Sequence, residues 1–274
     1  MRASTWTARI ITALIAVIVA PIGLGLLATG GLQLSFVTMT SSAGMTAGPS
    51  LLEVVLQLLL GGLLLVGIVL TGIWSSAGLI AAGSLALVPL VLAIAPALTM
   101  GLYRLLSDTI SRHWLDGLLM GIPLMILPVF AGLGLALMGL RRRSTPLPAG
   151  GVIAGLIGIP IALLIGGWMT VTGIDQIYRL IMQQFSVEAP PLALVSVIGG
   201  TLIVVGALAA VRWSPYALIL PAVALIVATL LRAFAPNALF SILRPFGLDT
   251  AARVMTGIEV GAVPTVAAIY LAFT

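Results

Sequence analysis

The chain has 274 residues, of which 61% are hydrophobic and only 7% are charged. A soluble domain carries about a quarter charged residues, so this composition excludes a water-soluble globule. The absence of Cys excludes disulfides and thiolate metal sites. Apolar runs of roughly 20 residues, the length that spans a bilayer core, predict an all-α polytopic membrane protein rather than a β-barrel. The net charge of +5 is better explained by membrane topology than by nucleic-acid binding.

The first half of the chain is predicted to contain four transmembrane helices. The first apolar run follows Arg2 and Arg9 as in a signal peptide, but it is longer than the apolar centre of about 7–15 residues that such peptides carry. We therefore expect a retained first helix. Residues 33–50, which are rich in Ser, Thr and Gly, are predicted to form a loop. The predicted helices are 10–32, 51–73, 77–98 (interrupted by Pro89 and Pro96) and 117–140.

A charged segment, residues 99–116, separates the third and fourth predicted helices. Arg104, Asp108, Arg112 and Asp116 stand four residues apart, so they share one face of a helix and can pair in sequence. Apolar residues fall largely on the other faces. This pattern predicts a short amphipathic helix at the membrane surface.

The second half follows the same order after the Arg cluster at 141–143, which precedes a linker stiffened by Pro146 and Pro148. Its predicted transmembrane helices are 151–173, 192–211, 216–231 and about 257–274. Two further interfacial segments, 174–191 and 232–256, are expected between them.

The distribution of Arg predicts the orientation. With the amino terminus inside, all seven acids and six Arg fall on outward segments. The inward segments hold no acid and the other six Arg, which are Arg2, Arg9, Arg141, Arg142, Arg143 and Arg212. The Arg tally is equal, but three consecutive Arg in one short loop outweigh scattered ones. We therefore expect both termini in the cytoplasm.

Matches at a nearly fixed spacing indicate an internal duplication. One constant spacing in sequence relates Pro21 to Pro160, Gly61 to Gly200, and Trp74 to Trp213. After a slip of a single position, the spacing relates Pro96 to Pro236, Arg104 to Arg244, and Gly117 to Gly257. We expect two tandem four-helix repeats, residues 1–140 and 141–274, in the same orientation within one membrane domain. This plan is similar to that of carriers built from parallel repeats.

Enzymatic chemistry has little support in the sequence. The only His, His113, is interpreted as an ordinary surface residue. There is no G-x-S-x-G, H-E-x-x-H or phosphate-binding loop. We therefore expect a protein that is not an enzyme and has no catalytic residue, cofactor or metal site. The Gly-rich strings are interpreted as contacts between helices.

The outward segments are the predicted functional region, because they are long enough to form a rim over the bundle. Glu259 lies between Gly257 and Gly261, so its carboxylate is placed to face a crevice and to pair with Arg253 or Arg244. The predicted outward groove comprises Glu259, Arg253, Arg244, Glu53, Arg104, Asp108, Arg112 and Asp116.

Two functions fit these features. Duplication and proline-kinked, Gly-rich helices favour a permease- or flippase-like transporter of a neutral or lipid-like molecule. The uncharged interior and the amphipathic outward segments favour a non-catalytic accessory or assembly subunit that contacts a membrane protein partner. In both cases we expect a multi-pass protein of a bacterial cytoplasmic membrane, with the lipid bilayer as its surroundings and no nucleic-acid partner.

Overall fold

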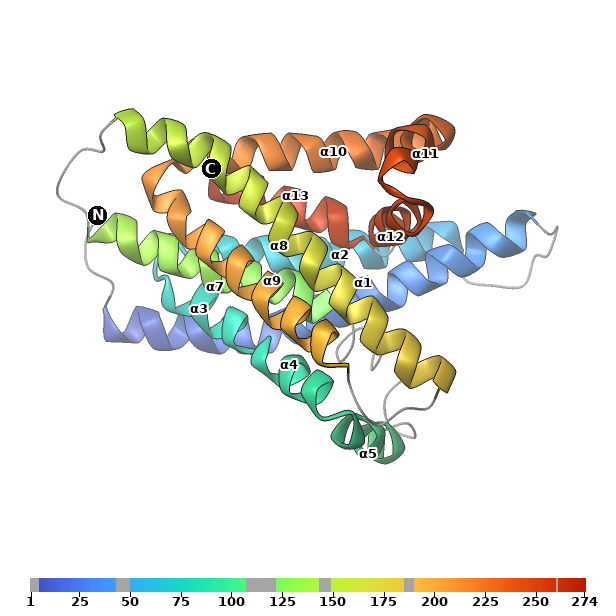
Figure 1. Ribbon diagram of the computed structural model, residues 1–274. Helices are drawn as coiled ribbons and strands as arrows, with labels where there is room; N and C mark the ends of the chain where they lie inside the picture. Colours follow the sequence, from blue (N-terminus) through green and yellow to red (C-terminus); the bar gives the residue numbers. More distant parts are fainter. Residues whose placement is uncertain (1–4, 43–49, 107–121, 143–148, 185–189, 260) are drawn as a thin grey trace.

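Long apolar helices make up most of the described chain (Figure 1). The computed structural model describes residues 5–42, 50–106, 122–142, 149–184, 190–259 and 261–274, and within these ranges it contains helices and turns but no strand. Six helical segments of this part of the chain are long and apolar enough to cross a membrane. They are α1 (Trp6–Ser42), α2 (Leu51–Thr71), α7 (Ile122–Arg141), α8 (Ala149–Gln184), α9 (Pro191–Ala209) with η1 (Ala210–Trp213), and η2 (Pro215–Leu218) with α10 (Ile219–Phe234).

Shorter helices complete the bundle. α3 (Ala77–Ser84) and α4 (Leu87–Ile94) follow one another closely, and α13 (Ala262–Phe273) is apolar but has only 12 residues. At 1.5 Å per residue α13 is about 18 Å long, which is less than the roughly 30 Å of a bilayer core. The other short elements are α5 (Pro96–Leu106), α11 (Pro236–Leu243), η3 (Arg244–Phe246) and α12 (Leu248–Glu259). In Figure 1, α5, α11 and α12 lie at the end of the bundle opposite the one where α1 begins.

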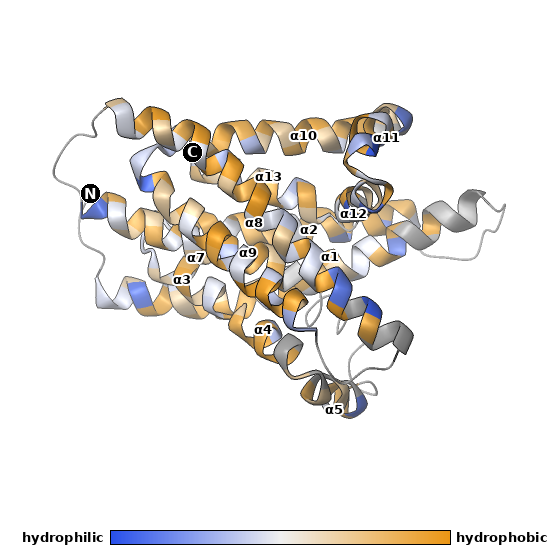
Figure 2. Cartoon of the chain, in the orientation of Figure 1, coloured by the Kyte–Doolittle hydropathy of each residue, from blue (hydrophilic) through white to orange (hydrophobic). Residues whose placement is uncertain are grey.

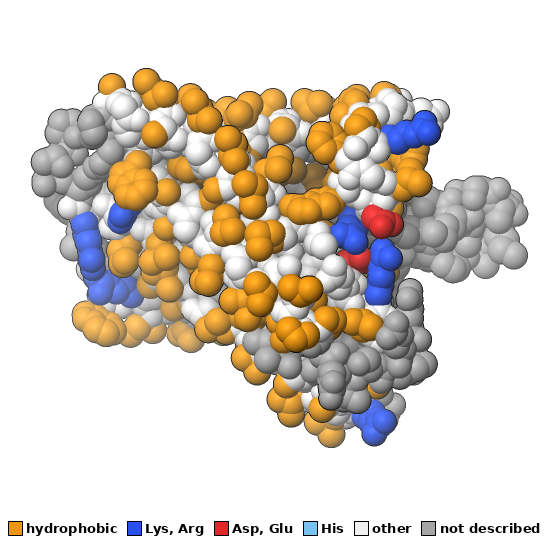
Figure 3. All heavy atoms as spheres, viewed as in Figure 1, with side chains coloured by type: hydrophobic (Ala, Val, Ile, Leu, Met, Phe, Trp, Pro, Cys, Tyr) orange, Lys and Arg blue, Asp and Glu red, His pale blue; other side chains and the backbone are white. Residues whose placement is uncertain are grey.

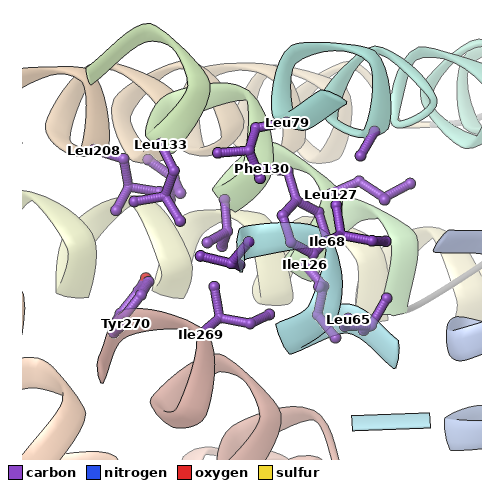
Figure 4. Packing of buried hydrophobic residues seen from close by; sticks show 14 of the residues in the cluster. Leu65, Ile68, Leu79, Ile126, Leu127, Phe130, Leu133, Leu208, Ile269 and Tyr270 are labelled. Atoms are coloured by element: carbon purple, nitrogen blue, oxygen red, sulfur yellow. The ribbon is translucent and has the colours of Figure 1, made fainter. Parts of the chain in front are cut away.

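The helices pack in a reciprocal pattern. α1 packs along α2, and α8 packs along α9. α7 contacts α3 and crosses to α9, while α13 contacts α10 and crosses to α2. α7 and α13 therefore lie near the centre, where Phe130 and Tyr270 are buried with Leu65, Ile126 and Leu208 (Figure 4).

The sides of the bundle are apolar (Figure 2). Large hydrophobic side chains are exposed along α1, α2, α8, α9 and α10, with Leu63, Leu164 and Leu202 among them. A soluble monomer rarely exposes apolar patches larger than a few hundred Å². An exterior of this kind is typical of an integral membrane protein, whose lipid-facing surface needs no polar cover.

Two glycines bring the helices of the long pairs into close contact. A Cβ atom at Gly61 of α2 would lie 2.8 Å from the carbonyl oxygen of Gly23 on α1. A Cβ at Gly200 of α9 would lie 2.6 Å from the carbonyl oxygen of Gly166 on α8. Between helices in lipid, van der Waals packing replaces the hydrophobic effect as the main source of attraction, and small residues allow it.

Several predicted boundaries are wrong. α1 continues to Ser42, so the first part of the predicted 33–50 loop is helical. α8 continues to Gln184, so residues 174–184 extend the helix instead of forming a separate surface segment. The predicted amphipathic helix 99–116 begins earlier, at Pro96, and residues 107–121 lie outside the described ranges. The last helix begins at Ala262 and not near 257, because Gly261 adopts a left-handed conformation with φ 76°.

The interruption of the third predicted helix also differs from expectation. The break lies at Leu85 and Ala86, one turn before Pro89, which itself sits inside α4. The ring of a proline clashes with the carbonyl of the residue four positions earlier, which here is Leu85. The Leu85 carbonyl instead accepts from Val88 N–H at 3.1 Å in a tighter turn. The second break, at Ala95 before Pro96, agrees with the prediction.

Candidate functional site

The two ends of the bundle differ in charge. At the end where α1 begins, α7 ends with Arg141 and η1 carries Arg212, and the space-filling view shows basic side chains at this end (Figure 3). Arg141 donates from Nη2 to the carbonyl oxygens of Gly72 and Ile73, and so caps the end of α2. Arg212 lies over the Trp213 ring, with 4.8 Å from Cζ to the ring centroid. These contacts stabilise the ends of α2 and η1.

The opposite end carries both acids and bases (Figure 3). Asp175 on α8 accepts from two Arg residues: its Oδ2 is 3.0 Å from Nε of Arg179 and 2.7 Å from Nη2 of Arg253 on α12. Arg253 also donates from Nη1 to Oγ1 of Thr172 at 3.1 Å, and its Cζ lies 6.0 Å from the centroid of the Trp168 ring. We call these five residues the α8–α12 cluster.

One face of α8 supplies four members of the cluster. Trp168, Thr172, Asp175 and Arg179 are spaced by four, three and four residues, which aligns them along a single helical stripe. The stripe exists because α8 remains helical beyond its apolar span. Asp175 and Arg253 are shielded, with side chains 25% and 17% exposed, while Arg179 is 49% exposed. The Arg253–Asp175 pair is therefore less screened by solvent than an ordinary surface pair.

α12 presents Arg253 to this stripe. α12 lies between two glycines with positive φ, Gly247 at 103° and Gly261 at 76°. Residues other than glycine rarely adopt these backbone conformations. Gly261 is also tightly packed, since a Cβ there would lie 3.0 Å from Leu58 and 3.3 Å from Leu27. The position of Arg253 thus depends on a short helix with a sharp turn at each end.

α8 and α10 form a wedge-shaped opening beneath α12. α8 packs extensively on η2, which directly precedes α10, but not on α10 itself. α10 instead packs along α13. From η2 onward the two helices diverge towards the charged end (Figure 1), and the space-filling view is hollowed between them, with hydrophobic side chains at the margins (Figure 3). We call this recess the α8–α10 wedge.

A second recess lies along the exposed side of α2. It is an open depression of about 300 Å³ lined by Ser50, Leu52, Glu53, Leu56, Gln57 and Leu60. The Oε1 atom of Gln57 is buried there without a hydrogen-bond partner. Among the described residues, no group of three or more His, Cys, Asp or Glu lies close enough together to hold a metal ion.

The described members of the predicted groove lie on separate elements. Arg253 joins the α8–α12 cluster, where its partner is Asp175. Glu259, predicted to pair with Arg253 or Arg244, is the last residue of α12, and its side chain lies outside the described part of the structure. Three predicted members are exposed on separate elements, Glu53 on α2, Arg104 on α5 and Arg244 on η3. Asp108, Arg112 and Asp116 lie outside the described residues.

The sequence prediction missed four members of the cluster. Asp175 and Arg179 were assigned to a surface segment, and neither Trp168 nor Thr172 was considered. The signal that could have identified them is their spacing along one face of a helix that meets neither Gly nor Pro between Gly173 and Pro190.

No protein-family model, curated protein or solved structure matches this chain.

Proposed function

We propose that the protein is a permease- or flippase-like transporter that admits a neutral or lipid-like molecule through the α8–α10 wedge. The observation that carries this proposal is the divergence of α8 from α10, which opens an apolar recess on the side of the bundle. A lipid-like molecule can enter such a recess from the bilayer without crossing water. The charged cluster at its end offers polar partners to a headgroup.

We further propose an architecture of eight spans in two tandem four-helix repeats, residues 1–140 and 141–274. Six spans have sufficient length, and the two shorter apolar helices, 77–92 and 262–273, supply the remaining pair. The reciprocal contacts support the duplication, because α7 of the first half meets α9 of the second while α13 of the second meets α2 of the first. An axis along the membrane normal relates two such halves.

The glycine contacts support the same duplication and refine its register. Gly166 and Gly173 follow Gly23 and Gly30 at one shared spacing, and each pair of equivalents lies against the second helix of its own half. The spacing from Gly61 to Gly200 is shorter by about one helical turn. When the two halves are aligned, the match of α8 to α1 is therefore offset by about one helical turn from the match of α9 to α2. The sequence supports this alignment with Thr29-Gly30-x-x-Gln33 and Thr172-Gly173-x-x-Gln176.

The proposed orientation places both termini in the cytoplasm of a bacterial cell. Arg141 and Arg142, beside the linker, lie at the end where α1 begins, and the acids Asp175 and Asp249 belong to elements of the other end. Arg concentrated in a short loop beside a helix end faces the cytoplasm in most membrane proteins.

An accessory or assembly subunit is the second candidate. Phe246 and Leu248 are exposed beside the charged residues Arg244 and Asp249, on short helices at the end of the bundle. Apolar side chains with a polar rim are typical of a protein-binding surface. The expected partner in this case is another membrane protein that docks on α11 and α12.

A lipid-flipping assay tests the first candidate. The protein is reconstituted in vesicles containing a fluorescent phospholipid, and dithionite then bleaches only the outer leaflet. We expect bleaching of the inner-leaflet label to be faster than in protein-free vesicles. The chain has no Cys, so Ala252→Cys on α12 and Gln176→Cys on α8, both exposed positions, can be bridged by a flexible bis-maleimide.

The bridged protein should lose the activity, while the same variant treated with a monofunctional maleimide should keep it. Flipping at the protein-free rate by monodisperse wild-type protein would reject this transport proposal. A stoichiometric membrane partner that co-purifies in mild detergent would then favour the accessory subunit.

A further inference from the structure

α12 differs from the other helices in how it is attached. Its two ends are the described glycines with positive φ, Gly247 and Gly261. Such glycines absorb large changes in backbone dihedrals at little steric cost, which is the requirement for a hinge. Gly261 is held against Leu27 and Leu58 of the α1–α2 pair. These two points define an axis about which α12 can rotate while Gly261 stays anchored on the α1–α2 pair.

The ion pair, hydrogen bond and ring contact described between α12 and α8 are all made by one long side chain, that of Arg253. The extensive packing of α12 is with η3, α11, α13, α1 and α10. Contact with α8 is made by Arg253, through the 2.7 Å ion pair with Asp175, the 3.1 Å hydrogen bond to Thr172 and the ring of Trp168. Because α8 and α10 diverge below this point, Arg253 joins the two sides of the wedge at its wide end.

The contact between Arg253 and Asp175 can be broken without leaving Asp175 unpaired. Asp175 also pairs with Arg179 one turn further along α8, so its carboxylate keeps a cationic partner when Arg253 leaves. A carboxylate stripped of its partner in a shielded site would be costly. The Nε atom of Arg253 is buried without a hydrogen-bond partner, so the closed state leaves one donor of the guanidinium unsatisfied. Release into the headgroup region would satisfy it.

We infer that α12 is a hinged gate over the α8–α10 wedge, latched shut by Arg253 on Asp175. This inference rests on the proposed function, for which it supplies the regulation: the gate admits a lipid-like molecule only when the latch is released. Arg179 is not part of the latch: it gives the Asp175 carboxylate a second cationic partner, which remains when Arg253 leaves. The latched state is the one described by the structure.

Distances between spin labels test the gate without any transport measurement. Labels at Ala252→Cys on α12 and Gln176→Cys on α8 report the gap, and labels at Ile153→Cys and Tyr216→Cys report the closed end of the wedge; all four positions are exposed. In the first pair we expect Arg253→Gln to add a population that is longer by more than the roughly 2 Å that separates rearrangement from local adjustment. The second pair should not change, which also verifies the fold.

The matched control is Arg179→Gln, which removes the other partner of Asp175 and leaves the latch in place. It should keep the short distance. Asp175→Asn breaks the latch from the α8 side and should reproduce the long population, so the test survives if Arg253→Gln fails to fold. The inference is overturned if both latch variants retain the wild-type distribution, or if Arg179→Gln opens the gap equally. Opening without lipid flipping would reject the transport proposal and leave the gate intact.

Discussion

The close crossing of α8 and α9 can be tested with one added methyl group. Gly200→Ala places a Cβ 2.5 Å from Oγ1 of Thr170 and 2.6 Å from the carbonyl oxygen of Gly166. Gly206 lies on the same helix and serves as the matched control, because a Cβ there meets nothing within 4 Å. The two substitutions are chemically identical and differ only in what the methyl group contacts.

The magnitude follows from the distances. Ordinary van der Waals contact begins at 3.4 Å, so the 2.6 Å approach requires α8 and α9 to separate by about 0.8 Å. A gap of that size forfeits a quarter to a half of the dispersion energy of each contact near the crossing. Overpacking typically costs about 1–3 kcal/mol, and a loss of about 2 kcal/mol corresponds to a roughly thirty-fold change in the unfolding equilibrium. Gly206→Ala should be neutral or slightly stabilising, because Ala favours a helix over Gly.

Unfolding in detergent, followed by the loss of helical circular dichroism with denaturant, measures the difference. Gly61→Ala and Gly67→Ala extend the test to α2, because a Cβ at Gly61 would be 2.8 Å from the carbonyl oxygen of Gly23 while one at Gly67 meets nothing within 4 Å. We expect Gly61→Ala to lower the free energy of unfolding as Gly200→Ala does. Gly67→Ala should have as little effect as Gly206→Ala. Equal unfolding midpoints for the clashing and the open positions would refute the close packing of both helix pairs.

Two further predictions concern the ends of the bundle. Arg141→Gln should lower the free energy of unfolding by about 2 kcal/mol, because Arg141 caps the carbonyl oxygens at the end of α2; Arg142→Gln, an exposed neighbour, should have little effect, and equal unfolding midpoints would contradict the cap. In intact cells, an impermeant maleimide should label Ser241→Cys on α11 but not Ala149→Cys at the start of α8, both of which are exposed. The reverse labelling pattern would invert the proposed orientation.

Hydropathy predicts where a helix can cross a membrane and not where it ends. The starts of α2, α8 and α9 lie within two residues of prediction, because Pro and Ser precede or open them. α1 and α8 were both predicted to stop where their apolar runs stop. Neither sequence contains a helix breaker there: α1 meets no Gly or Pro after Gly31 until Gly44. Polar residues outside the bilayer can continue a helix whose hydrogen bonds are already established.

The candidate site was predictable only in part. The pairing of Asp175 with Arg179 is a local contact between positions i and i+4, which sequence spacing can identify. The contact between Arg253 and Asp175 spans 78 residues and depends on the turns at Gly247 and Gly261. Glu259 was expected to pair with Arg253 or Arg244, because Gly257 and Gly261 on either side of it allow close approach between helices. The Glu259 side chain lies outside the described part of the structure, whereas the Arg253 side chain reaches Asp175 on a different helix.

The proposed duplication explains why the latch belongs to one half only. In the register that aligns Gly30 with Gly173, Asp175 and Arg179 of α8 correspond to Leu32 and Phe36 of α1. The glycines that hold each first helix against its neighbour are kept in both copies, whereas the ion-pairing positions are apolar in the first copy. Packing therefore constrains both halves equally, and charge distinguishes them. In the first half α1 packs along α3. In the second half α8 packs extensively on η2 but not on α10, and Arg253 spans the α8–α10 wedge beyond η2. A gate is needed only where the helices diverge, and that is where the second copy carries its acid and its two bases.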